Sequence, residues 1–144
     1  MKKKIATVWL GGCSGCHMSL LDIDERILEV AKLADIVKCP IVDGKDMQQV
    51  DVALVEGSVT SDEHYRELLH IRKLCTVLVA LGDCALMTNI TGMRNYFSLK
   101  EVRDTAYVSS PSNDSEGVLP NHPALLKLHD KVVPLQAVVK VDVM

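Results

Sequence analysis

Three cysteines of this sequence stand in short glycine-containing turns, each directly after an aliphatic run. Cys13 and Cys16 lie three residues apart in the turn after residues 5–10, and Cys84 lies in the turn after residues 77–81. The loops at the carboxyl ends of neighbouring parallel strands converge on one edge of a sheet, so the three thiols are expected to lie together. Three thiolates at one edge indicate a metal or metal–sulfur site.

Other chemistry is compatible with part of this pattern. A Cys-x-x-Cys pair where a strand meets a helix is also typical of thiol–disulfide oxidoreductases, and the pair alone fits both readings. Cys84 favours the metal site because a dithiol site needs no third thiol. Zinc stays an alternative, although zinc ribbons bring their ligands as two close pairs. Cys39 and Cys75 are expected to be small buried residues away from this edge.

Two further side chains near the cysteines are candidates for a functional role. His17 follows Cys16 and can donate to a cluster sulfur or contact a partner, but a capping or packing role fits its position equally well. Glu56 ends an aliphatic run, where it can relay protons, contact a partner or be an ordinary exposed carboxylate. The other histidines show no ligand spacing with one another and are expected at the surface: His64, His70, His122 and His129.

Alternating strands and helices are expected to position these residues. Apolar residues at helical spacing predict a helix over residues 19–33, and Thr60 or Ser61 can cap a second one. Strand–helix alternation with short connections predicts a parallel α/β sheet with helices on both faces. Aliphatic runs predict five strands, at residues 5–10, 35–38, 52–55, 77–81 and 138–143.

Five strands fit the flavodoxin-like order 2-1-3-4-5, which brings Cys13, Cys16, Glu56 and Cys84 to one rim. Glycines in these loops let the backbone approach a bulky inorganic ligand. A helix that begins just after Cys16 points its positive end at the thiolates. The later part of the chain is less regular, with a polar surface loop expected over residues 109–117 and a short helix over 123–129.

Composition and charge narrow the class of protein. The 144 residues indicate one domain, and 48% apolar with only 3% aromatic residues suits buried parallel strands. A net charge of −3 gives no electrostatic case for nucleic acid. No run of 18 apolar residues is present, so no membrane span is expected. The basic start is followed by too short an apolar run for a signal peptide, so a cytoplasmic chain is expected, in which five cysteines indicate metal or redox chemistry.

Residues 7–19, Thr-Val-Trp-Leu-Gly-Gly-Cys-Ser-Gly-Cys-His-Met-Ser, closely resemble the start of the small subunit of [NiFe] hydrogenases, in the short cytoplasmic type of NAD-reducing, bidirectional enzymes. Residues 55–57, 81–85 and 92–95 resemble the family's next motifs in the right order, so the resemblance covers essentially the whole chain. The cluster-bearing subunit of respiratory complex I shares the fold and the site. It has adjacent cysteines in place of the Cys-x-x-Cys pair, which favours the hydrogenase.

The resemblance implies that Cys13, Cys16 and Cys84 bind the proximal [4Fe-4S] cluster, close to a nickel–iron centre in a separate large subunit. Glu56 matches a glutamate near the cluster and the subunit interface, with a proton or interface role. The implied protein is the electron-transfer subunit of a soluble hydrogen:NAD oxidoreductase and is not catalytic alone. It passes electrons between the large subunit and an NAD(P)-linked diaphorase arm of iron–sulfur and flavin subunits.

One feature departs from the family. A [4Fe-4S] cluster commonly takes four thiolates, and the family's fourth cysteine stands in a Pro-Gly-Cys-Pro-Pro loop after the last strand. This sequence ends at Met144, at or inside that strand. The chain, a single flavodoxin-like iron–sulfur domain over residues 1–144, is therefore expected to be truncated or partly recorded, without the C-terminal segment that carries this ligand. A three-iron cluster, a non-cysteine ligand such as water, or no cluster are the alternatives.

Two other functions compete with the hydrogenase. A flavin-binding module of the flavodoxin type, with FMN as cofactor, fits the fold, but the loop after the first strand lacks a serine- and threonine-rich phosphate cradle and carries two cysteines instead. A thiol–disulfide oxidoreductase needs only Cys13 and Cys16. Substitution of Cys84 separates these readings, because only the cluster site needs the third thiol.

Overall fold

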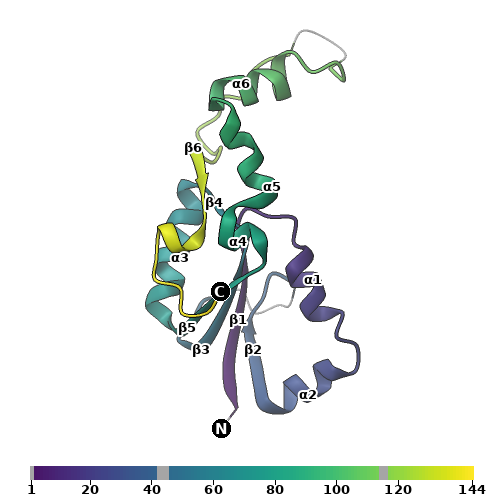
Figure 1. Ribbon diagram of the computed structural model, residues 1–144, viewed down its shortest axis with the longest axis vertical. Coiled ribbons are helices and arrows are strands. Elements are labelled where there is room, and N and C mark those ends of the chain that lie inside the picture. Colours follow the sequence, from purple (N-terminus) through teal and green to yellow (C-terminus); the bar gives the residue numbers. More distant parts are fainter. Residues whose placement is uncertain (1, 42–45, 114–116) are drawn as a thin grey trace.

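The computed structural model describes residues 2–41, 46–113 and 117–144, and a parallel sheet lies at its centre (Figure 1). Within these residues the sheet has four strands in the order β2-β1-β3-β5, all paired in parallel. Its strands are β1 (Lys3–Trp9), β2 (Ala34–Lys38), β3 (Val50–Glu56) and β5 (Cys75–Leu81). This confirms the predicted α/β class and the first four positions of the flavodoxin-like order.

The predicted fifth strand over 138–143 does not form as a regular strand in the described residues. Val143 makes an isolated parallel bridge with Val79, beside the outer edge of β5. The carboxylate of Asp142 accepts the Leu78 N–H at 2.9 Å. A side chain therefore takes one of the backbone donors that a regular ladder would use, and the segment follows the expected path without the full pairing.

Two helices replace the single helix predicted over 19–33. α1 covers Gly15–Leu21 and α2 covers Arg26–Leu33. Asp24 lies between them with a φ of 51°, in the left-handed region that interrupts a right-handed helix. Because α1 begins at Gly15, Cys16 lies inside its first turn, whereas the sequence predicted a helix starting after this residue.

The helix α3 covers Asp62–Leu74 and begins where the sequence predicted. The Ser61 hydroxyl accepts the His64 N–H at 3.3 Å, which confirms one of the two predicted caps. Acidic residues in the first turn and basic residues in the last complement the helix dipole. α3 packs beside β5, while α1 and α2 lie beside β1 and β2 (Figure 1).

After β5 the chain passes through short helices that leave the sheet and form an arm, residues 89–108 (Figure 1). The arm is tied to the body by Asn95, whose side chain donates to the Val132 carbonyl at 2.9 Å and accepts the Val132 N–H at 2.7 Å. The chain first forms α4 (Asp83–Met87), and the arm then consists of α5 (Asn89–Gly92), η1 (Met93–Tyr96), α6 (Leu99–Arg103) and η2 (Asp104–Val108). A further short helix outside the arm, η3 (Leu135–Ala137), lies later in the chain.

A second, antiparallel pair of strands joins β4 (Val59–Ser61) to β6 (Leu128–Val133). The short helix predicted over 123–129 is therefore wrong, because the end of this segment pairs with β4. Of the polar loop predicted over 109–117, residues 114–116 lie outside the described residues, and 109–113 form no helix or strand.

The core consists of aliphatic side chains from both faces of the sheet, together with α3. Ala6, Val55, Leu68, Ile71 and Leu78 are fully buried. The near-continuous aliphatic strands are what a parallel sheet covered by helices requires. Among the described residues, no helix combines the length and the apolar character needed to cross a bilayer.

Candidate metal centre

The loops after β1 and β3 are joined by backbone hydrogen bonds at the carboxyl rim of the sheet. The Gly11 N–H donates to the Ser58 carbonyl at 2.9 Å, and the Ser58 N–H donates to the Gly11 carbonyl at 2.7 Å. Gly57, between these strands' ends, has a φ of 85°, and a Cβ there would lie 2.8 Å from the Gly11 oxygen. The loop that carries Cys13 is therefore fixed directly against the end of β3.

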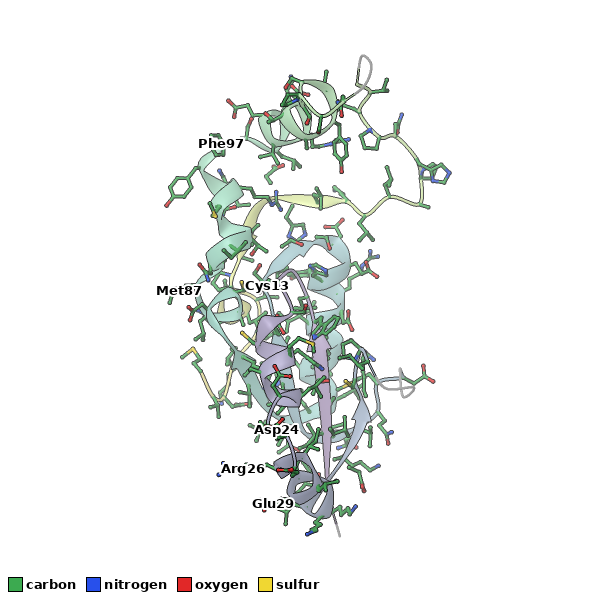
Figure 2. All side chains as sticks on the ribbon, turned by 90° about the vertical axis from the view of Figure 1, so that its right-hand side faces the viewer. Cys13, Asp24, Arg26, Glu29, Met87 and Phe97 are labelled. Carbon is green, nitrogen blue, oxygen red and sulfur yellow. The ribbon has the colours of Figure 1, made fainter. Side chains whose placement is uncertain are left out.

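The loop after β5 lies against Cys16. Gly82 has a φ of 82°, and a Cβ at this position would lie 2.0 Å from the Cys16 Sγ. Cys84 follows two residues later in the first turn of α4 and is 8% exposed. Cys13 is exposed, in the turn between β1 and α1 (Figure 2), and its Sγ would lie 3.4 Å from a Cβ at Gly15. The rim thus receives its cysteines from two loops, as the strand order predicted.

The electrostatics at Cys16 also reflect this clustering. Burial raises the pKa of the Cys16 thiol, and the negative charges of Glu56, Cys13, Cys84 and Asp83 raise it further. All four groups therefore lie close enough to act on the same sulfur. A thiol with a raised pKa keeps its proton unless a positive charge compensates the thiolate.

Glu56 is buried, with only 3% of its surface exposed. Its Oε2 accepts the His17 N–H at 2.8 Å, in the first turns of α1. Its Oε1 would lie 3.4 Å from a Cβ at Gly12. The alternative of an ordinary exposed carboxylate is therefore wrong, and Glu56 connects the end of β3 to the backbone just after Cys16.

The imidazole of His17 is packed inside the protein and is 1% exposed. Its ring meets Trp9 edge to face, with centroids 4.9 Å apart. Its Nε2 lies 3.3 Å from the Cys39 Sγ. Burial lowers the pKa of His17, and the charge of Glu56 partly opposes that shift. Of the roles left open for His17, which were donation to a cluster sulfur, contact with a partner, capping and packing, the structure supports packing.

The two remaining cysteines are buried, as expected. Cys75 begins β5 at the opposite end of the strand from Cys84, and burial raises the pKa of its thiol. Cys39 directly follows β2, and its Sγ contacts the ring of His17, the residue after Cys16. Cys39 is therefore nearer to the rim than predicted. Its contact is with the His17 ring and not with one of the three rim cysteines.

Two of the four histidines expected at the surface are partly buried. His64 Nδ1 lies 2.9 Å from the Thr60 hydroxyl, and burial lowers the pKa of His64. His129 Nε2 lies 2.8 Å from an Asp62 carboxylate oxygen, so it pairs β6 with α3. The His64 contact lies at the capped start of α3, and the His129 contact joins residues far apart in the sequence. The local sequence around each histidine therefore does not predict its partial burial. His70 and His122 are exposed as expected.

The three cysteines of this rim come from two separate loops. Within the described ranges, no three His, Cys, Asp or Glu side chains gather at the spacing of one metal ion. An iron–sulfur cluster demands a different arrangement, because its cysteines bind separate irons and stand around it. Three cysteines on two loops, with Gly82 leaving space beside Cys16, fit that arrangement.

Sequence reasoning missed two hydroxyl residues at this rim. Ser58 is fully buried and contacts both Gly11 and Thr91. Its position directly after Glu56 and Gly57, where a strand ends at the rim, was an available signal. Thr91 stands next to the motif at residues 92–95 but gave no signal of its own.

The fold and rim define a flavodoxin-like α/β protein with three cysteines gathered at the carboxyl edge of its sheet. The model of the family described as NADH ubiquinone oxidoreductase, 20 Kd subunit, matches residues 13–144, and the chain belongs to this family.

Known relatives are hydrogenase subunits. The chain is 37% identical over 144 residues to the NAD-reducing hydrogenase HoxS subunit delta of Cupriavidus necator, a match that covers 98% of this chain and 69% of that protein. It is 29% identical over 160 residues to the iron-sulfur subunit of an F420-non-reducing hydrogenase from Archaeoglobus profundus, covering 99% of this chain and 50% of that protein. The chain thus spans half the length of the archaeal relative.

A solved structure agrees with these sequence relatives. A chain from the crystal structure of an NAD+-reducing [NiFe]-hydrogenase in the H2-reduced state superimposes with a TM-score of 0.94 at 34% identity. The match covers 99% of this chain and 80% of that chain. The expected relationship with the NAD-reducing [NiFe] hydrogenases is confirmed, and the chain is related to subunits of an enzyme complex. None of these relatives' names includes a flavin.

Proposed function

We propose that this chain is the electron-transfer small subunit of an NAD-reducing [NiFe] hydrogenase and carries the proximal [4Fe-4S] cluster of that enzyme. The observation that carries the proposal is the contact between the Cys16 thiol and Gly82, which places Cys16 beside the loop of Cys84. The hydrogenase relatives support the same reading, and one of them is named as an iron-sulfur protein.

Each rim residue has a part in this function. Cys13, Cys16 and Cys84 would hold the cluster through their thiolates, and the bound cluster supplies one-electron chemistry. Glu56 holds the backbone after Cys16 through the His17 N–H. With one carboxylate oxygen committed to that bond, we assign Glu56 first to the shape of the cysteine turn, and second to the proton or interface role that the family implies.

A four-iron cluster takes a fourth ligand besides these three cysteines. The bridge between Val143 and Val79 runs parallel to β5, so the chain heads toward the carboxyl rim at this point. A residue that followed Met144 in a longer polypeptide would therefore arrive at the same rim. We propose that the fourth ligand approaches from this side.

The large subunit is the proposed partner of an apolar run that begins next to the rim. The run begins with Met87 at the end of α4 and continues at spacings of three or four residues with Ile90, Met93 and Phe97. Each of these side chains is at least 57% exposed. Figure 2 shows Met87 and Phe97 at the two ends of this run, on the outside of the molecule. An exposed apolar surface of this kind is typical of a protein interface, and its continuity with α4 supports an interface beside Cys84.

The further partner is a diaphorase module that couples these electrons to NAD(P), as the names of the relatives suggest. We place the assembled hetero-oligomer in the cytoplasm. The described cysteines form no disulfide with one another, which suits a reducing compartment.

The test uses the complex purified with its large subunit, analysed for iron and acid-labile sulfide. Cys84→Ser should remove most of the iron and sulfide, whereas Cys75→Ser, a buried cysteine at the opposite end of β5, should leave both in place. A flavin-binding module would keep its flavin in the Cys84→Ser variant, and a dithiol oxidoreductase would keep thiol exchange. Full iron content in that variant contradicts the proposal.

A further inference from the structure

A pair of hydroxyl groups connects the backbone next to the Cys13 loop with the backbone next to the Cys84 helix. The Ser58 Oγ and the Thr91 Oγ1 lie 2.5 Å apart. Ser58 is fully buried at the end of β3, and Thr91 lies on α5. The two residues are far apart in the sequence, so the contact depends on the tertiary fold.

On one side the pair reaches the loop of Cys13. The Ser58 hydroxyl lies 3.1 Å from the Gly11 carbonyl, two residues before the cysteine. The same carbonyl accepts the Ser58 N–H at 2.7 Å. The Ser58 N–H therefore holds Gly11, while the Ser58 hydroxyl beside it is available to Thr91.

On the other side the pair reaches the helix of Cys84. The Thr91 hydroxyl donates to the Thr88 carbonyl at 2.7 Å. The Thr88 N–H in turn donates to the Cys84 carbonyl at 3.1 Å. Thr88 has a φ of 70°, a left-handed conformation that is unfavourable for threonine and needs support from its surroundings. The Thr91 contact is one such support.

The available hydrogens allow one continuous series of hydrogen bonds from Gly11 through Ser58 and Thr91 to Thr88. The two hydroxyl groups have two hydrogens and make three contacts: Ser58 with Gly11, Ser58 with Thr91, and Thr91 with Thr88. When the Thr91 hydroxyl donates to the Thr88 carbonyl, the Thr91 oxygen can accept the hydrogen of the Ser58 hydroxyl. In that arrangement the Gly11 carbonyl keeps the Ser58 N–H, so no acceptor is left without a donor. A chain of hydrogen bonds of this kind strengthens each member.

We propose that Ser58 and Thr91 are positioning residues that set the separation between the Cys13 loop and the Cys84 helix. The inference rests on the proposed cluster site but concerns residues outside its ligand set. Neither hydroxyl belongs to a cysteine loop itself; each acts through the backbone next to one. Removal of either hydroxyl should loosen both loops together.

The test compares variants of the purified complex by hydrogen–deuterium exchange and by the rate at which iron is lost to a chelator. Ser58→Ala and Thr91→Val each remove one hydroxyl with little change of shape. Thr91→Ser keeps the hydroxyl and should restore wild-type behaviour. Ser61→Ala is the matched control, because Ser61 is an equally buried serine whose hydroxyl caps α3 away from the cysteines.

Ser58→Ala and Thr91→Val should each raise the rate of amide hydrogen–deuterium exchange in two segments, residues 10–16 and residues 83–92. The expected increase is about five- to tenfold, the range given by one lost hydrogen bond. Iron release should accelerate, and the double variant should be no worse than either single variant because both break one chain. The EPR signal of the reduced cluster should also change in these variants and not in Ser61→Ala.

Exchange that rises only around the substituted residue overturns the inference, as does a Ser61→Ala variant with the same pattern. The outcome for the proposed function is separate. A wild-type complex without iron and sulfide refutes the cluster, and the exchange measurement then decides by itself whether the hydroxyl pair couples the two loops.

Discussion

The sharpest consequence of this geometry concerns Gly82, whose substitution by alanine should damage the site more than the fold. Gly82 has φ 82° and ψ 169°, a region that is essentially restricted to glycine and costs any other residue about 1–3 kcal/mol. That strain alone should lower the free energy of unfolding by this amount, which thermal or urea denaturation can measure.

The added methyl group also meets the Cys16 thiol. A Cβ at Gly82 would lie 2.0 Å from the Cys16 Sγ, whereas non-bonded contacts settle at about 3.5 Å, so the atoms must separate by about 1.5 Å. The thiol is the end of a rotatable side chain, and its easiest response is to turn away from the rim. A displacement above about 1 Å is enough to disable a metal site.

The control is Gly15→Ala, which adds the same methyl group beside another cysteine. At Gly15 the nearest atom would be the Cys13 Sγ at an ordinary 3.4 Å, and the residue begins α1. We expect Gly15→Ala to keep its iron and Gly82→Ala to lose most of it, as measured by iron and sulfide per copy of the purified complex. Equal iron content and equal stability in the two variants would refute the reasoning.

Three further predictions follow from contacts outside the cysteine turns. Glu56→Ala should lower the free energy of unfolding by about 1–3 kcal/mol, because the buried His17 N–H loses its acceptor; urea denaturation measures this, and Glu56→Gln should be milder. Ser61→Ala should lower it by about 0.5–2 kcal/mol through the lost cap, seen as a lower Tm. The Leu78 N–H and Arg72 lower the pKa of Asp142, so this carboxylate stabilises the fold above its unfolded pKa of about 3.9, and that contribution is lost as the pH falls through the lower folded value. Urea midpoints measured against pH should show a shallower acid dependence in Asp142→Asn, and identical curves would contradict this account.

Elements that depend on local sequence were predictable. Aliphatic runs define the four strands of the sheet, and Ser61 with its acidic neighbours defines the start of α3. Given the strand order, the common rim of the cysteines followed from the rule that parallel strands end at one edge. The glycines around the turns were visible too, although only the structure shows that Gly82 is the one in contact with Cys16.

Elements that depend on distant partners were not predictable. Residues 128–133 become a strand because β4 offers them an edge, and no periodicity within the segment indicates this. Glu56 is buried because the His17 N–H satisfies it, and a carboxylate in an isolated sequence is expected in water. The break between α1 and α2 depends on the left-handed conformation of Asp24, which helical spacing of apolar residues does not reveal.

The clamp between Asn95 and Val132 has a consequence for assembly. Because its two hydrogen bonds hold η1 against β6, the apolar side chains on that helix stand in a fixed arrangement before any partner arrives. When a partner docks there, little conformational entropy is lost in ordering this segment, so burial of its apolar area contributes more to the binding free energy. Arg94, whose guanidinium donates to the Thr60 carbonyl at 3.1 Å, secures the same helix to β4, so η1 would present an ordered surface at the proposed interface.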